Sequence, residues 1–292
     1  MNTLTTRSSG VGAFVASLWR PFAGRFAPPR AVVAAAASDV GTVRANNEDY
    51  FLMADLARPA LTVRSGDPST ALTSHGPLLV VADGMGGAAG GEVGSAMAAE
   101  IIGSHVTPAV REHRRRTAWQ WRKALADAFD VANQRIRSRA EADSALRGMG
   151  TTATAVVIVG DTLYVAHVGD SRAYLVRDGQ ARRLTRDHTW LQYALEAGRT
   201  EAEAADDPRR NALLRALGPK PDVTVDTAHV DVRAGDTVIL CTDGLWSVVD
   251  DDELARAVAA HEDLRTLCDT LLTLANGRGG RDNVTVVAAR LD

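Results

Sequence analysis

The 292-residue chain has few cysteines and no long apolar segment. Its two cysteines, Cys241 and Cys268, are too few for a disulfide framework and favour a reducing compartment, so we expect a cytoplasmic protein. The longest apolar run, residues 31–37, has the length of a strand and falls short of the roughly 18–20 residues that span a bilayer. These absences argue against disulfide-stapled and membrane-spanning classes.

Positive charge is also scarce, because 33 Lys and Arg residues face 36 Asp and Glu residues, which gives a net charge of −3. No basic field therefore indicates nucleic acid as a partner. The first 38 residues differ, with four Arg and no acid. Most of these Arg residues follow the apolar stretch 11–19, whereas a signal peptide places its charges ahead of a longer apolar core. We expect residues 1–30 to be a disordered extension rather than a targeting segment or a membrane-surface helix.

From residue 31 onward, short apolar strands alternate with turns and a few helical blocks. Consecutive short strands favour antiparallel sheets over a regular βαβ alternation, and one domain over residues 31–292 is the simplest organisation. We expect 162–167 and 173–177 to form a hairpin, 65–76 to be a polar loop and 185–221 to be an exposed helical insertion. The expected strands are 31–38, 78–82, 152–159, 162–167, 173–177, 223–230, 237–241 and 284–289. The expected helices are 91–105, 117–146, 188–197, 209–217, 251–260 and 263–275.

Four acids lie at the ends of the most apolar strands. Asp83 and Asp243 each follow a buried run and precede a glycine, Asp170 follows a third run, and Asp282 precedes the last strand. A single Asp-Gly pair is usually only a turn. Four such acids that converge would repel one another unless a cation lies among them, and we therefore predict a metal site.

The donors at this predicted site are oxygens, namely the four carboxylates and the carbonyl of Gly84. Hard oxygen sites favour Mg²⁺ or Mn²⁺, and no Cys or His pair has the spacing of a zinc site. His113, His188 and His261 are better interpreted as surface or packing residues.

Covalent phosphatase chemistry is disfavoured by spacing. An aspartyl nucleophile requires an Asp two positions before Asp83 or Asp243, where Val81 and Cys241 stand, and neither cysteine has an Arg six positions later. A phosphate-binding loop with its Gly-Lys pair is also absent from the sequence. A water activated by the metal is therefore the expected nucleophile.

Upstream of these acids, Arg44 precedes Glu48 and Asp49 in one short segment. The planar guanidinium of an Arg matches the geometry of phosphate, so Arg44 is a candidate phosphate clamp. Glu48 and Asp49 are candidates to orient water or this Arg. The alternative is an ordinary solvated ion pair in a loop.

The ordered set of these motifs resembles the metal-dependent, type 2C serine/threonine protein phosphatases in their bacterial form. The motifs that carry the resemblance lie at 38–49, 83–87, 148–152, 169–172, 242–244 and 282–283. The resemblance implies an α+β fold, a four-layer αββα sandwich of two antiparallel sheets flanked by helix pairs. It also implies phosphoprotein substrates, the opposing action of a serine/threonine kinase and a monomeric enzyme. The net charge and the short apolar runs predict no nucleic-acid partner and no membrane span.

By position, the resemblance implies that Asp83 bridges two ions, Mn²⁺ or Mg²⁺, with the Gly84 carbonyl on one and Asp243 and Asp282 on the other. Asp170 matches the position that binds a third, weaker ion together with Asp243. Residues 185–221 match the variable flap of the family.

The same resemblance implies that Arg44 binds the substrate phosphate and that Glu48 and Asp49 act through water. Two positions depart from the pattern. Met85 stands where eukaryotic relatives carry a His that protonates the leaving group, and Asn211 stands where some bacterial relatives place a flap Ser beside the third ion. One alternative is a protein of the same fold that binds a partner without catalysis, but such a protein would lack one of the four acids, and all four are present. The other alternative is a phosphatase that acts on a single antagonist protein.

Overall fold

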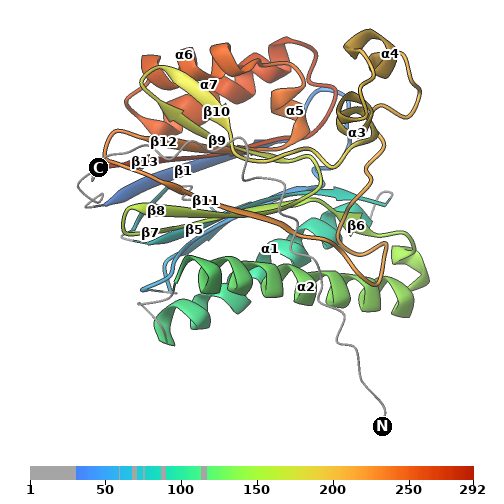
Figure 1. The fold of residues 1–292 in the computed structure, drawn as a ribbon, viewed down its shortest axis with the longest axis horizontal. Coiled ribbons are helices and arrows are strands. Elements are labelled where there is room, and N and C mark those ends of the chain that lie inside the picture. The colour runs from blue at the N-terminus through green and yellow to red at the C-terminus, as the bar shows by residue number, and fades with distance from the viewer. Residues whose placement is uncertain (1–30, 59, 68–70, 75, 87–89, 113–116) are drawn as a thin grey trace.

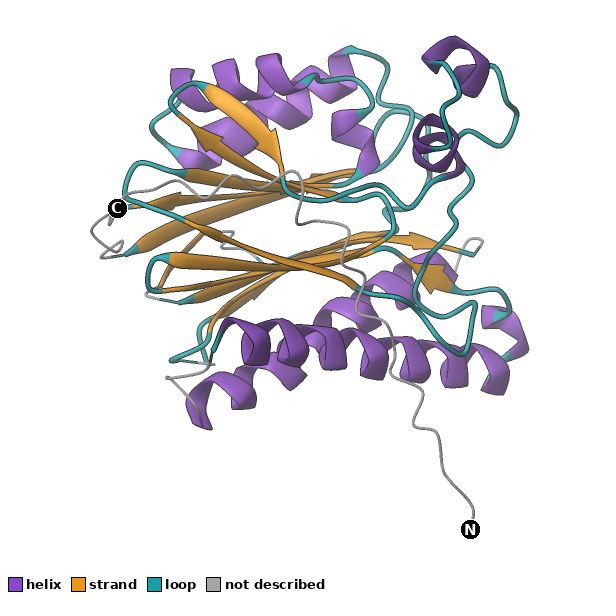
Figure 2. Ribbon diagram, viewed as in Figure 1, coloured by secondary structure: helices purple, strands orange, loops and turns teal. Residues whose placement is uncertain are grey.

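The structure is a computed structural model of the chain, and it describes residues 31–58, 60–67, 71–74, 76–86, 90–112 and 117–292. The expected N-terminal extension, residues 1–30, lies outside these residues. Two antiparallel sheets are stacked face to face, and helices cover the outer face of each (Figures 1 and 2). This arrangement confirms the expected α+β sandwich.

The first sheet has the strand order β10-β9-β12-β13-β1-β4, and the second has β11-β8-β7-β5-β2-β3 with β6 paired to β5. The strands of the first sheet are β1 (Val32–Asp39), β4 (Ala71–Ser74), β9 (Arg172–Arg177), β10 (Gln180–Arg183), β12 (Thr237–Cys241) and β13 (Val284–Leu291). The strands of the second are β2 (Asp49–Asp55), β3 (Thr62–Arg64), β5 (Pro77–Met85), β6 (Gly150–Thr151), β7 (Ala153–Val159), β8 (Thr162–Val168) and β11 (Asp226–Asp231).

Two long helices cover the second sheet, and a group of shorter helices covers the first (Figure 1). The long pair is α1 (Gly90–Glu112) and α2 (Ala118–Ala142), which is followed by a 3₁₀ turn at Ser144–Leu146. The other group is α5 (Asp243–Trp246), α6 (Asp251–Ala260) and α7 (Leu264–Gly277). Two short helices, α3 (Trp190–Glu196) and α4 (Glu201–Ala205), lie in the segment after β10.

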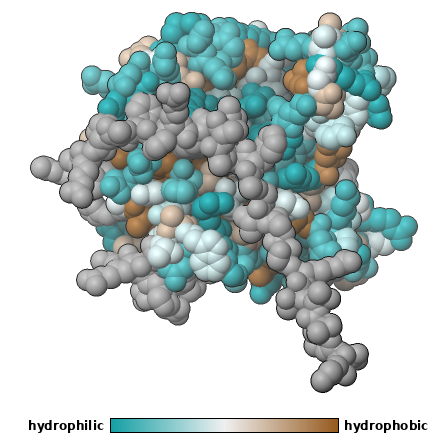
Figure 3. Space-filling model, in the orientation of Figure 1, coloured by the Kyte–Doolittle hydropathy of each residue, from teal (hydrophilic) through white to brown (hydrophobic). Residues whose placement is uncertain are grey.

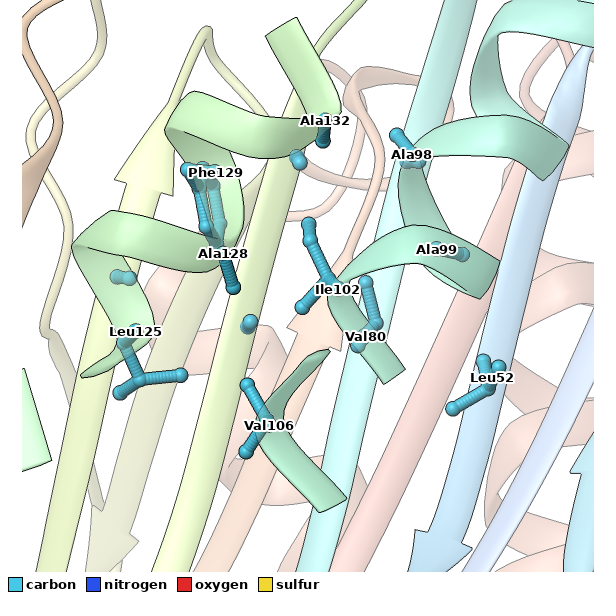
Figure 4. Packing of buried hydrophobic residues seen from close by; sticks show 14 of the residues in the cluster. Leu52, Val80, Ala98, Ala99, Ile102, Val106, Leu125, Ala128, Phe129 and Ala132 are labelled. Atoms are coloured by element: carbon cyan, nitrogen blue, oxygen red, sulfur yellow. The ribbon is translucent and has the colours of Figure 1, made fainter. Parts of the chain in front are cut away.

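The continuous apolar runs of the central strands follow from burial on both faces. In β5, Leu79 and Val81 point between the two sheets, while Leu78, Val80 and Ala82 point toward the long helices. Figure 4 shows the second set from close by, with Val80 packed among Ile102, Phe129 and other residues of α1 and α2. A third cluster fills the space between the first sheet and α5–α7. These three hydrophobic clusters hold the central strands in place and so fix the positions of the strand ends at the site.

Four local predictions were wrong. Strands β8 and β9 do not form a hairpin, because they belong to different sheets and residues 169–171 cross between them. The predicted helix 209–217 is irregular, because Leu213 and Leu217 make isolated backbone bridges to distant segments. The polar loop 65–76 contains β4, which pairs with β1. Helix α2 ends at Ala142, four residues before its predicted end.

None of the helices that the structure describes is long and apolar enough to cross a membrane. On the face of the molecule in Figure 3, the described atoms are mostly hydrophilic and the hydrophobic ones are scattered. The continuous apolar runs of β5, β12 and β13 therefore lie in the interior of the molecule.

Candidate active site

Five acids from separate parts of the chain come together at one end of the two sheets. Asp49, the first residue of β2, is the direct antiparallel partner of Asp83 near the end of β5. Asp243 is the first residue of α5, two residues after the end of β12, and Asp282 lies two residues before β13. Asp170 lies in the segment that crosses from one sheet to the other.

Burial and mutual repulsion raise the pKa of four of these acids. Burial raises the pKa of Asp83 well above its usual range, and the charges of the other four acids raise it further. Burial, opposed by hydrogen bonds from hydroxyl groups, raises the pKa of Asp49 to about 7. For the same primary reason the pKa of Asp170 rises to about 8 and that of Asp243 to about 6. The ionised acids repel one another, and a cation among them would relieve that repulsion.

The polar partners of the acids show which oxygens are available to a cation. Asp49 accepts a hydrogen bond of 2.7 Å from the Thr242 hydroxyl, and Asp282 accepts one of 2.8 Å from Arg44. Asp243 differs, because its buried Oδ1 has no hydrogen-bond partner among the described residues. Buried polar oxygens normally have a partner, so this atom fits a divalent cation as its missing partner. Within the described part of the chain, no group of three or more His, Cys, Asp or Glu side chains is arranged so that it could hold a metal ion.

The glycines that follow two of the acids are not turn residues. Gly84 continues β5, and a Cβ at this position would lie 2.0 Å from the carbonyl oxygen of Gly91. Gly244 lies inside α5, where a Cβ would be 2.1 Å from the carbonyl oxygen of Asn283. The interpretation of each Asp-Gly pair as an ordinary turn is therefore wrong. Close approach of a second backbone segment requires glycine at both positions.

A cavity of about 480 Å³ opens over these residues. Its lining includes Asp83, Asp243 and Asp282 together with Arg44 and Glu48, all of which the sequence identified. Asp49 and Asp170 do not line it. The remaining lining residues are Ala45, Asn46, Gly84, Met85, Gly86 and Asn283.

Arg44 lies at the mouth of this cavity with half of its side chain exposed. Its ion pair with Asp282 joins it to an acid of the site rather than to an unrelated loop residue. Burial raises the pKa of Glu48, and the nearby Arg44 lowers it. The loop that carries both residues therefore faces the acids.

Asn283 belongs to a motif that the sequence singled out, but its role was not predicted. Its Oδ1 accepts a hydrogen bond of 2.8 Å from the backbone N–H of Glu48, and its Nδ2 donates to the carbonyls of Val40 and Asn46, each at 2.9 Å. Asn283 thereby ties the Arg44–Glu48 loop to the segment that carries Asp282 and leads into β13. Its only signal in the sequence was its place directly after Asp282. Asn211, in contrast, is exposed and does not line the cavity.

Comparison with known proteins shows the family. The model of the family described as protein phosphatase 2C matches residues 67–278. The chain belongs to the protein phosphatase 2C family. The serine/threonine phosphatase Stp of Listeria monocytogenes is 37% identical over 227 residues, which cover 74% of this chain and 85% of that protein. The serine/threonine phosphatase PstP of Mycobacterium tuberculosis is 37% identical over 87% of this chain and 44% of that protein.

Solved structures of bacterial phosphatases agree with the fold. The S. agalactiae serine/threonine phosphatase superimposes with a TM-score of 0.76 at 30% identity, and covers 89% of this chain and all of that one. The catalytic domain of PstP in complex with two manganese ions gives a TM-score of 0.71 at 34% identity, and covers 90% of this phosphatase and all of that chain. The expectation of a serine/threonine protein phosphatase acting on phosphoproteins is therefore confirmed.

Proposed function

We propose that this phosphatase hydrolyses phosphoserine and phosphothreonine with two divalent cations held by Asp83, the Gly84 carbonyl, Asp243 and Asp282. The observation that carries the proposal is the buried, unpartnered Oδ1 of Asp243 among acids that raise one another's pKa. The manganese-bound relative supports Mn²⁺ as one of the ions. When bound, such ions lower the pKa of a coordinated water and neutralise phosphate oxygens.

We propose direct attack by water, without a phosphoenzyme. The cavity residues that the structure describes include no Cys, Ser, Thr or His to serve as a nucleophile. Glu48 and Asp49 would orient this water, and the Thr242 hydroxyl donates a hydrogen bond to Asp49. Because Met85 cannot donate a proton, water would protonate the leaving alkoxide.

The test is release of inorganic phosphate from a phosphothreonine peptide. We expect release with Mn²⁺, loss of release with a chelator, and recovery when Mn²⁺ is restored in excess. The same peptide with phosphotyrosine serves as the control substrate and should react more slowly. Peptide binding without phosphate release at any Mn²⁺ concentration would instead support the alternative of a binding module.

Arg44→Ala is expected to raise the KM for a small aryl phosphate by roughly tenfold or more, because a charged hydrogen bond to phosphate contributes about 1.5–3 kcal/mol. Arg44→Lys keeps the charge but loses the planar pair of donors, so its KM should lie between those of wild type and Arg44→Ala. Steady-state kinetics at saturating Mn²⁺ separate KM from kcat. An unchanged KM in Arg44→Ala would remove the clamp role.

We propose that Asp170 and Asp243 hold a third, weaker ion, because Asp170 is buried and the charge of Asp243 contributes to its raised pKa. Mg²⁺ would also serve at these oxygen donors. Residues 185–221 would form the flap beside the site.

We also propose that residues 31–292 form one domain. The first strand, β1, pairs with the last, β13, along its whole length, which supports closure of a single unit. The substrates are made by serine/threonine kinases, and such a kinase would be the opposing enzyme. We propose a monomer, as the family resemblance implies, and a cytoplasmic location, because both buried cysteines are free thiols.

A further inference from the structure

The segment that carries Asp170 is a tight crossing between the two sheets. Strand β8 ends at Val168 in the second sheet, and β9 begins at Arg172 in the first. Gly169 has a φ of +110°, and a Cβ there would lie 2.5 Å from the Cβ of Thr152. The backbone at Gly169 therefore sets where the Asp170 carboxylate lies.

His188 satisfies both backbone groups of Gly169. The His188 N–H donates to the Gly169 carbonyl at 2.7 Å, and the Gly169 N–H donates to His188 Nδ1 at 3.1 Å. The imidazole is buried and lies against the His167 ring, with the ring centroids 4.8 Å apart. The expectation that His188 is a packing residue is thus incomplete, because the ring also holds this crossing segment.

The hydrogen bond that Nδ1 accepts fixes the tautomer of the His188 ring. Since Nδ1 accepts from Gly169, the proton of the neutral ring lies on Nε2, which donates to Asp226 Oδ2 at 3.1 Å. The other oxygen of Asp226 accepts a hydrogen bond of 2.8 Å from Arg215. Asp226 belongs to β11, and Arg215 lies near the end of the 185–221 segment. A continuous hydrogen-bonded chain therefore links this segment to Gly169.

The other side of the crossing is held by the residue before His188. Asp187 accepts two hydrogen bonds from the Arg172 guanidinium, at 3.0 and 2.7 Å. This guanidinium lies 3.7 Å from the centre of the Trp246 ring, and Trp246 Nε1 donates to the Asp170 carbonyl at 2.9 Å. The pair Asp187–His188 thus contacts the crossing segment both before and after Asp170.

We infer that His188 is a positioning residue, which fixes Gly169 and thereby aims the Asp170 carboxylate at the metal site. The carbonyl of His188 also accepts a hydrogen bond of 2.7 Å from the N–H of Leu214. This bond joins the two ends of the segment that contains α3 and α4. A displacement of the segment would move Gly169 and Asp170 together. The inference rests on the proposed role of Asp170 as a metal ligand.

The test compares His188→Asn with His188→Leu, because these side chains have nearly the same shape and only Asn places an acceptor near Nδ1. Hydrogen exchange of the Gly169 amide, followed by NMR on the ¹⁵N-labelled full chain, should be about fivefold faster in the Leu variant and near wild type in the Asn variant. Mn²⁺ calorimetry should show about tenfold weaker binding in the Leu variant at the sites that Asp170→Ala removes.

Equal exchange of Gly169 in the two variants would overturn the inference. If the Leu variant does not fold, Asp226→Leu serves instead: its side chain in β11 is 26% exposed, the change removes the acceptor of the Nε2 proton, and it should also speed Gly169 exchange. If Asp170→Ala removes no Mn²⁺ site, the ligand role of Asp170 fails. The Gly169 exchange then still decides whether His188 positions this backbone.

Discussion

Asp83→Asn is expected to lower kcat for a phosphothreonine peptide by about a thousandfold or more, with a normal far-UV circular dichroism spectrum. Asp83 is the acid whose pKa is raised by all four of the others, so its carboxylate lies at the centre of the group. The amide keeps the shape of the side chain and removes the charge that two cations would share. The measurement is single-substrate kinetics over a wide Mn²⁺ range, because weaker binding alone would be overcome by excess Mn²⁺.

The same variant should be more stable than wild type in the presence of a chelator. A raised pKa means that the folded state favours the protonated form, so an ionised Asp83 lowers the free energy of unfolding at neutral pH. Removing the charge removes that penalty, and Mn²⁺ should then raise Tm less than it does in wild type.

Asp127→Asn, on the exposed face of α2, is the matched control and should change neither kcat nor the free energy of unfolding. Turnover in Asp83→Asn equal to that of wild type at saturating Mn²⁺ would contradict the bridging role.

The parts of the fold that the sequence predicted are those that depend on local burial. Strands β5, β12 and β13 are continuous apolar runs because both of their faces are buried, and each of these runs adjoins an acid. The periodicity of α7 likewise matches its buried residues, from Leu264 to Ala275. A strand that is buried on both faces ends at a fixed place, and the acids next to it could therefore be selected without coordinates.

The parts that the sequence did not predict depend on pairings between distant segments. The crossing at residues 169–171 has the sequence of a turn, and only the sheet order shows that its two strands belong to different layers. Strand β2, which begins at Asp49, was missed although it pairs with β5 through the centre of the second sheet. Asn283 acts through three backbone groups about 235 to 243 positions away, and no local pattern reports such contacts.

A buried ion pair far from the cavity was also missed. Arg177 at the end of β9 donates from Nε to Asp236 Oδ1 at 2.7 Å and from Nη2 to Oδ2 at 2.5 Å, and both side chains are nine-tenths or more buried. Asp236 Oδ2 also accepts from the backbone N–H of Arg233, and Arg177 Nη2 donates to the Asp231 carbonyl of the second sheet. The pair therefore joins the two sheets at an edge.

Asp236→Ala is expected to lower the free energy of unfolding by about 3–5 kcal/mol, because it leaves the Arg177 guanidinium buried without its counter-ion. Urea unfolding in the presence of a chelator measures this loss apart from metal binding. The double variant Arg177→Met with Asp236→Leu removes both charges and should lose much less, since the cost comes from the unpaired charge rather than from the absence of the bond. Asp127→Ala, which breaks the exposed pair with Lys123, should change stability by less than about 1 kcal/mol. A loss in Asp236→Ala as small as that control would show that water reaches Arg177 and that the pair does not hold the sheets together.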